Sequence, residues 1–201
     1  NETLPKGRKQ KTTALYDRFV SKGAVMGDSF GLESVLWFAN DPKDAYEEPT
    51  IKRSRSHEYI SKEVKNVREN VGVIEIANFS KHEFKGPDAR KFLNYVLAGI
   101  IPKPGRISLN PMLTPKGKLY GDLTVACLSE NKFIVFGSGA VQEMHRRWFE
   151  KHLKDFNLIY KNRSDDFHGL ALSGPKSREL LQKLVRENIS NENFKFRDVK
   201  E

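Results

Sequence analysis

The chain contains a single cysteine, Cys127, among its 201 residues. One cysteine excludes a disulfide within the chain and any zinc site built from cysteine thiolates. Cysteine-poor chains are typical of reducing compartments, so we expect a cytoplasmic location. The sequence also lacks an apolar run near the roughly 18 residues of a membrane span, and its first 22 residues lack the apolar core of a signal peptide. We therefore predict no membrane association.

Several catalytic and nucleotide-binding motifs are absent. The five histidines show no metal-type spacing with carboxylates, so we predict no metal site. There is no Gly-x-Ser-x-Gly elbow and no Walker-type glycine loop. The Gly137-Ser138-Gly139 segment has Gln142 where a dinucleotide-binding turn needs its third glycine. We interpret it as a tight turn from a strand into a helix.

The charge is strongly basic, with a formal net charge of +9. Basic chains often bind nucleic acid, but no RNA-recognition or zinc-finger signature is present. The basic residues are dispersed and interrupted by an acidic patch within residues 41–48. This distribution makes nucleic acid an unfavoured partner. It also suits a smaller polyanionic ligand or an acidic surface of a neighbouring domain.

The first part of the chain has weak periodicity. We expect residues 1–12 to form a solvated, flexible arm and residues 13–40 to form an irregular packed connector. A helix is predicted for residues 56–69, with Tyr59, Val64 and Val67 facing inward, and a strand for residues 71–76. We place a basic arm and connector at residues 1–60 and the main domain at residues 61–201.

An internal repeat organises the main domain. Residues 83–97 read EFKGPDARKFLNYVL, and residues 171–185 read ALSGPKSRELLQKLV. The Gly-Pro pairs match, as do Arg90 and Arg178, and the apolar positions of both copies have helical spacing. Each copy therefore predicts a strand, a Gly-Pro turn and an amphipathic helix. We predict an α+β fold with two pseudo-symmetric strand–helix repeats around antiparallel sheets.

The segment between the copies supplies more sheet. Residues 119–128 and 133–136 are predicted to form a hairpin, followed by a helix at 140–153 and a strand at 158–160. The expected inward positions of that helix are Val141, Met144 and Trp148, with His152 as a further candidate.

The stretch from residue 107 to residue 125, ISLNPMLTPKGKLYGDLTV, is the most informative part of the sequence. A proline-broken segment precedes a Pro-Lys-Gly turn and a strand. Strand alternation places Leu123, Val125 and Cys127 on one face, where Cys127 would be buried and inert. Tyr120, Asp122 and Thr124 are expected on the other face. These residues could line a polar pocket or simply form the exposed side of an ordinary antiparallel strand.

Residues 71–125, which include the motif Met112-Leu113-Thr114-Pro115-Lys116-Gly117, resemble the folate-binding aminomethyltransferase family. That family includes the glycine cleavage T-protein and the C-terminal halves of dimethylglycine and sarcosine dehydrogenases. Residues 31–38, GLESVLWF, are similar to a Gly-Trp-Glu-x-Pro-x-Trp-Phe segment of the dehydrogenase subgroup. The chain is most like that subgroup, over roughly residues 12–198.

The resemblance implies a tetrahydrofolate site. Asp122 matches an acid that lies near the reactive folate nitrogens, and Thr124 matches a hydroxyl residue on the same strand face. The implied roles are catalysis for Asp122 and cofactor binding for Tyr120, Asp122, Thr124, Met112 and Leu113.

The resemblance also implies a reaction. A one-carbon unit from a small N-methylated amine, such as dimethylglycine or sarcosine, would be captured as 5,10-methylene-tetrahydrofolate. The FAD of such an enzyme would belong to a neighbouring N-terminal flavin domain, and a eukaryotic member would be expected in the mitochondrial matrix. The family's Tyr-x-Gly-Glu-x-Gly segment has no match before Glu201, so we expect this chain to be an excerpt that lacks redox activity by itself.

Two alternatives stay open. The chain could come from an aminomethyltransferase or another folate-dependent demethylase, which would share Asp122 but lack the connector at residues 31–38. It could instead be a basic RNA-binding module on a folate-binding fold, which would bind RNA with a steep salt dependence and no need for folate.

Overall fold

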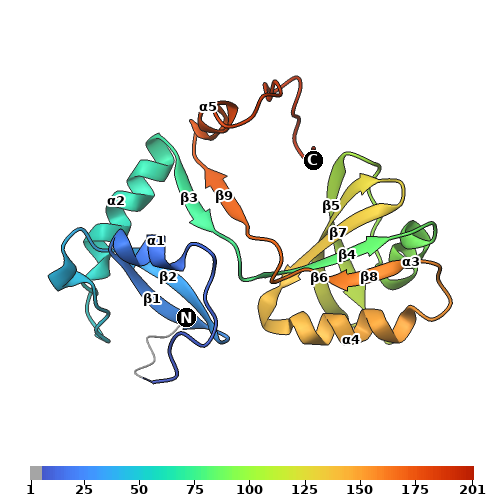
Figure 1. The fold of residues 1–201 in the computed structure, drawn as a ribbon, viewed down its shortest axis with the longest axis horizontal. Helices are drawn as coiled ribbons and strands as arrows, with labels where there is room; N and C mark the ends of the chain where they lie inside the picture. The colour runs from blue at the N-terminus through green and yellow to red at the C-terminus, as the bar shows by residue number, and fades with distance from the viewer. Residues whose placement is uncertain (1–5) are drawn as a thin grey trace. The chain divides into compact units, whose positions relative to one another are not determined.

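The computed structural model describes residues 6–201, which form two compact units (Figure 1). Unit 1 contains residues 1–78 and 168–189, and unit 2 contains residues 79–167 and 190–201. The mixture of helices with antiparallel sheets confirms the predicted α+β class. The predicted division of the chain into residues 1–60 and 61–201 stays a prediction, because each of the two units combines separate segments of the chain. No helix within residues 6–201 has the length and apolar character needed to cross a bilayer.

Unit 1 begins with regular structure where an irregular connector is predicted. Helix α1 (Tyr16–Ser21) precedes a hairpin of β1 (Ala24–Ser29) and β2 (Leu32–Phe38), so the prediction for residues 13–40 is wrong. Phe30 and Gly31 form the turn with φ of 53° and 86°, as in the tight turns that suit a twisted hairpin. A bulge between Val25 and Met26 breaks the alternation from which the strands could be recognised.

The basic arm is partly anchored. Residues 1–5 lie outside the described residues, but Arg8 donates hydrogen bonds to the carboxylate of Glu33, which is 2% exposed, with the Nε–Oε1 pair at 2.8 Å. This ion pair lowers the pKa of Glu33 although burial opposes the shift. For residues 6–12 the prediction of a loose arm is therefore wrong, because a buried carboxylate needs a charged partner.

The rest of unit 1 consists of a short 3₁₀ turn (Pro42–Asp44), α2 (Ser56–Glu69), β3 (Gly72–Glu75), β9 (Leu170–Ser173) and α5 (Ser177–Gln182). The predicted helix at 56–69 is confirmed. Its predicted inward face is only partly correct, because Tyr59 packs against the core formed by Val25, Trp37 and Ala39, whereas Val64 is 48% exposed.

Unit 2 is built on a five-stranded antiparallel sheet in the order β5-β6-β7-β4-β8 (Figure 1). Its elements are β4 (Phe79–Lys85), α3 (Ala89–Val96), β5 (Arg106–Leu113), β6 (Leu119–Ser129), β7 (Lys132–Ser138), a 3₁₀ turn (Gly139–Val141), α4 (Gln142–His152) and β8 (Ile159–Asn162). The predicted hairpin, the helix after it and the strand at 158–160 are confirmed within a few residues. The turn at 137–139 does lead from a strand into a helix.

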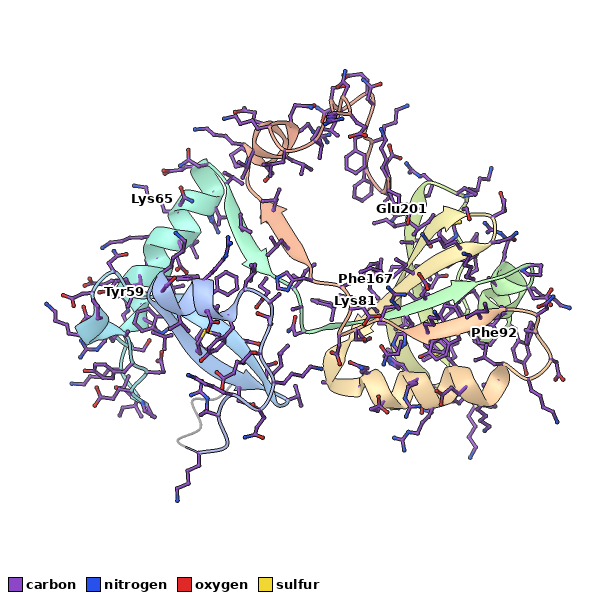
Figure 2. The ribbon with its side chains drawn as sticks, viewed as in Figure 1. Tyr59, Lys65, Lys81, Phe92, Phe167 and Glu201 are labelled. Carbon is purple, nitrogen blue, oxygen red and sulfur yellow. The ribbon has the colours of Figure 1, made fainter. Side chains whose placement is uncertain are left out.

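One face of this sheet carries the main core. Side chains of α3 and α4, including Phe92 and Phe149, pack on Phe84, Leu123 and other inward residues of the strands. Figure 2 labels Phe92 on α3. Cys127 is fully buried in this core, and burial raises the pKa of its thiol, which confirms the prediction. On α4 the fully buried residues are His145 and Phe149. Of the predicted inward set, Trp148 does pack against the core, whereas Val141, Met144 and His152 are half-buried, so the set is partly correct but misses the centre of the helix face.

Strand β5 was not predicted, because Pro111 breaks its pattern. In the structure Pro111 lies opposite Asp122, and the Pro111 carbonyl accepts a hydrogen bond from the Ala98 amide at 2.8 Å. β6 is the only named strand that pairs with β5 among the described residues. An edge position of this kind tolerates proline, since the missing N–H faces away from the ladder.

The structure confirms the internal repeat and shows that each repeated unit extends beyond the matching segments at residues 83–97 and 171–185. A helix and a strand precede each copy, giving the order helix–strand–strand–helix at residues 56–96 and 142–182. The two copies pair reciprocally: β3 of the first pairs with β9 of the second, and β4 of the first pairs with β8 of the second. Each unit therefore contains half of each copy.

The matched arginines have equivalent contacts. Arg90 donates to the carbonyl of Pro102 at 3.0 Å, and Arg178 donates to the carbonyl of Ile189. Each arginine thus ties its helix to a carbonyl 11 or 12 residues further along the chain. The apolar face of the second copy is less buried, with Leu184 at 74% exposure.

Two histidines lie in the interior of unit 2. His82 and His145 are 0% and 1% exposed, and their ring centroids are 6.3 Å apart. Tyr160 holds His82 Nδ1 through its hydroxyl at 2.8 Å. Burial, together with repulsion from His145, lowers the pKa of His82 to about 4. Both rings are neutral at physiological pH.

We predict that unit 2 loses stability in mild acid. The folded pKa of His82 is below its ordinary value of 6.5, so the unfolded state binds the proton more readily. Stability present above pH 6.5 is therefore lost as the pH falls toward 4, by about 3 kcal/mol for a shift of this size. Urea unfolding between pH 7.5 and 4 measures this, and His82→Phe should flatten the profile. An unchanged slope in the variant would contradict the assignment.

We also predict that Gly86→Ala destabilises the chain by more than about 1 kcal/mol. Gly86 has φ of +147°, and a Cβ there would lie 2.7 Å from Leu158 Cα and 2.8 Å from the Asn157 carbonyl oxygen. Gly117 is a matched control, since its φ is +71° with nothing within 4 Å of the added carbon. Thermal unfolding should show a clearly larger loss for Gly86→Ala than for Gly117→Ala.

Candidate functional site

The candidate site lies on the face of the unit 2 sheet opposite α3 and α4, at the paired ends of β5 and β6. Inward residues of β6, such as Leu123 and Val125, are fully buried in the core. On the other face of β6, Asp122 is exposed and Thr124 is half-buried. The predicted alternation is therefore correct for Asp122 and Thr124.

Tyr120 does not share this face. Met112 pairs with Gly121 while Leu113 pairs with Leu119, so Tyr120 is an extra residue on β6 and forms a β-bulge. The bulge turns Tyr120 toward the core, where its ring packs on Trp148 of α4 with centroids 4.6 Å apart. The prediction that Tyr120 lies beside Asp122 is wrong, because one inserted residue reverses the alternation.

Met112 and Leu113, the two other residues implied by the resemblance, lie on opposite faces of the sheet. Met112 is fully buried in the core beneath the sheet, so its side chain is not on the candidate face. Leu113 is 36% exposed and lies opposite Leu119. The structure brings Asp122, Thr124 and Leu113 together on one face and places Tyr120 and Met112 behind it.

Asp122 is surrounded by apolar side chains. Pro111 lies directly across from it, and Leu109, opposite Thr124, is 63% exposed. Leu119 is 66% exposed at the bulged end. Within residues 6–201 no hydrogen bond or ion pair occupies the Asp122 carboxylate. An unpaired acid within an exposed apolar surface can accept hydrogen bonds from a flat apolar ring that carries N–H donors.

Basic residues lie near the same end of the sheet. Lys116 and Lys118 are exposed in the turn that joins β5 to β6. They could attract the anionic part of a ligand whose ring rests beside Asp122. Among residues 6–201 no group of three or more His, Cys, Asp or Glu side chains is arranged to hold a metal ion.

Comparison with known proteins identifies the family. The model of the GCVT N-terminal domain family matches residues 15–201. The chain belongs to this family. The resemblance stated from the residues is thereby confirmed.

Named relatives of this GCVT N-terminal domain are enzymes. Human mitochondrial dimethylglycine dehydrogenase is 34% identical over 194 residues, which is 95% of this chain and 22% of the relative. The aminomethyltransferase of Desulfitobacterium hafniense strain Y51 is 27% identical over 186 residues, which is 92% of this chain and 46% of the relative. The chain therefore spans less than half the length of these curated relatives.

Solved structures share the fold of this GCVT N-terminal domain. The glycine cleavage aminomethyltransferase T of Bartonella henselae superposes with a TM-score of 0.74 at 20% identity, over 96% of this chain and 48% of that protein. Heterotetrameric sarcosine oxidase from Corynebacterium sp. U-96 matches with a TM-score of 0.52 at 14% identity, over 75% of each chain. These likenesses confirm the predicted fold class.

Sequence reasoning missed Gly121 and His145 as parts of the site's framework. A Cβ on Gly121 would lie 2.8 Å from His145 Nε2, so the glycine lets the histidine ring approach the strand. A glycine inside a strand pattern, beside Tyr120, is a signal for a bulge or a close backbone approach. The role of His145 has no such local signal, because it depends on how α4 packs.

Proposed function

We propose that this domain binds tetrahydrofolate on the open sheet face at Asp122 and takes part in the transfer of a one-carbon unit from a small N-methylated amine. The observation that carries the proposal is the unpaired Asp122 carboxylate within an exposed apolar surface. Membership of the GCVT N-terminal domain family and the named enzymes among its relatives support it.

The residues present fit a reduced folate. Leu109, Pro111 and Leu113 offer an apolar surface for a pterin ring, and Asp122 and Thr124 offer acceptors for its N–H groups. Lys116 and Lys118 suit the anionic glutamate tail. When bound, tetrahydrofolate supplies the nitrogen atoms that accept the one-carbon unit as 5,10-methylene-tetrahydrofolate.

Asp122 would act through its charge. A carboxylate within hydrogen-bond distance of a folate nitrogen orients it, accepts its proton and stabilises positive charge that develops beside it. Leu109 and Leu119 would exclude water from the face, which strengthens each of these interactions. Thr124 would orient the ligand through its hydroxyl.

The parent protein that we propose is a dimethylglycine or sarcosine dehydrogenase that uses both FAD and folate. The higher identity to human dimethylglycine dehydrogenase, 34%, against 26–30% for the aminomethyltransferases, favours it. FAD would bind outside the described residues, because the only Gly-x-Gly turn before a helix that we find in them lacks the third glycine. A reducing compartment, the cytoplasm or the mitochondrial matrix, belongs to the same proposal.

The relatives named aminomethyltransferase favour a second candidate, a T-protein-like transferase that also uses folate. Both candidates need Asp122 in the same role. They differ in the amine that donates the carbon unit, so activity of the parent protein with dimethylglycine, rather than with an aminomethyl carrier, would decide between them.

We predict that Asp122→Asn weakens binding of 5-formyl-tetrahydrofolate by about tenfold or more, because a charge-assisted hydrogen bond contributes about 1.5–3 kcal/mol. Calorimetric titration of the purified chain measures the dissociation constant. Asp155→Asn, which changes an exposed acid in the turn after α4, is the control and should bind as the unchanged chain does. Equal affinity of the Asp122 variant and the unchanged chain would overturn this role.

A further inference from the structure

We propose that His145 is a positioning residue that holds the β-bulge at Tyr120 and thereby keeps Asp122 on the open face of the sheet. The inference rests on the proposed function in one respect only, the ligand that Asp122 would bind. In the structure, a buried side chain of α4 would control the direction of an exposed side chain on β6.

The bulge decides where Asp122 points. With Tyr120 as the extra residue, Asp122 pairs with Pro111 and faces outward. If regular pairing instead continued from Leu113 and Leu119, Asp122 would lie opposite Asn110, whose side chain is fully buried. A slip of one residue reverses every side chain of a strand. Without the bulge, the carboxylate would therefore face the core.

Helix α4 holds the bulge from the core side. Trp148 packs its ring on that of Tyr120, the inserted residue. One turn earlier, His145 occupies the space beside Gly121, where an added Cβ would lie 2.8 Å from His145 Nε2 and 3.1 Å from Met112 Cε. The imidazole thus packs directly on the main chain next to the bulge. A residue with a side chain at position 121 would displace either His145 or Met112.

The state of His145 suits this role. The ring is 1% exposed, and neither of its nitrogens has a hydrogen-bond partner of normal geometry within residues 6–201. Burial lowers its pKa, and the Tyr120 main chain opposes that shift. The main chain that acts on the His145 ring is therefore that of the bulge residue itself. A neutral imidazole can donate one proton toward the Tyr120 carbonyl and still pack as an apolar ring.

Phe149 provides a matched control on the same helix face. It is also fully buried, and it packs on Phe84, Phe92 and Tyr160, away from the bulge. His145→Leu and Phe149→Leu each replace a buried ring by the same acyclic apolar side chain. A purely structural role for His145 predicts similar effects of the two substitutions on the site.

The first measurement is nuclear Overhauser contact between Pro111 and Asp122, which reports the bulged register without any ligand. We expect His145→Leu to lose this contact and Phe149→Leu to keep it. Retention in both variants, or loss in both, would overturn the proposal. Should His145→Leu fail to fold, Gly121→Ala replaces it, since the added carbon would lie 2.8 Å from His145 Nε2, and Phe149→Leu remains the control.

The second measurement is binding of 5-formyl-tetrahydrofolate to the same variants. We expect His145→Leu to bind about tenfold more weakly or worse, because a small misplacement of a group that contacts a ligand is costly. Phe149→Leu should bind as the unchanged chain does. Equal affinities in the pair would overturn the link between His145 and the site. If the unchanged chain does not bind folate, the proposed function fails, while the register measurement still decides whether His145 positions Asp122.

Discussion

Backbone hydrogen bonds between the two copies of the internal repeat are the constraint on which both units depend. Neither copy pairs its own strands; β3 pairs with β9 and β4 pairs with β8. Each Gly-Pro turn and helix is thereby placed against the other copy, with Gly86 next to Asn157 and Gly174 next to Asn70. The five-stranded sheet exists only because this exchange adds β8 beside β4. That sheet then supplies the flat, one-sided surface on which the candidate site lies.

Polar side chains lie in two different environments at the site, one exposed to solvent and one buried in the core. Asp122 remains in solvent and unpaired, where a ligand can reach it. Directly behind the sheet, His82 and His145 are buried and neutral, because burial in that core disfavours a charged imidazolium ring. The single inserted residue at Tyr120 separates these environments. An ordinary strand with perfect alternation would have sent Tyr120 outward and left its position over α4 to be filled by Leu119.

Much of the fold could be predicted from the sequence because the repeat and the helix at 56–69 have clear helical spacing. The hairpin in residues 24–38 could not, since its bulge and its turn with Phe30 at positive φ hide the period of two. Strand β5 was hidden by Pro111, whose tolerance at a sheet edge is a property of the assembled sheet. At the site, Asp122 and Thr124 follow from alternation, whereas Tyr120 and Met112 do not, because pairing with β5 sets their direction. Asp122's role is drawn from resemblance and stays a proposal.

The reciprocal pairing also has a consequence for folding order. Gly72 must find Ser173, about a hundred positions later, and loops of this length make contact formation slow. Most of unit 2 lies between those partners, so during synthesis it can fold while β3 still waits for β9. Throughout that interval β3, with Val73 and Ile74, is an unpaired strand open to other chains. Because residues 79–167 of unit 2 lie between the two segments of unit 1, β3 is most exposed to aggregation during translation. That risk belongs to unit 1 and not to unit 2, which carries Asp122.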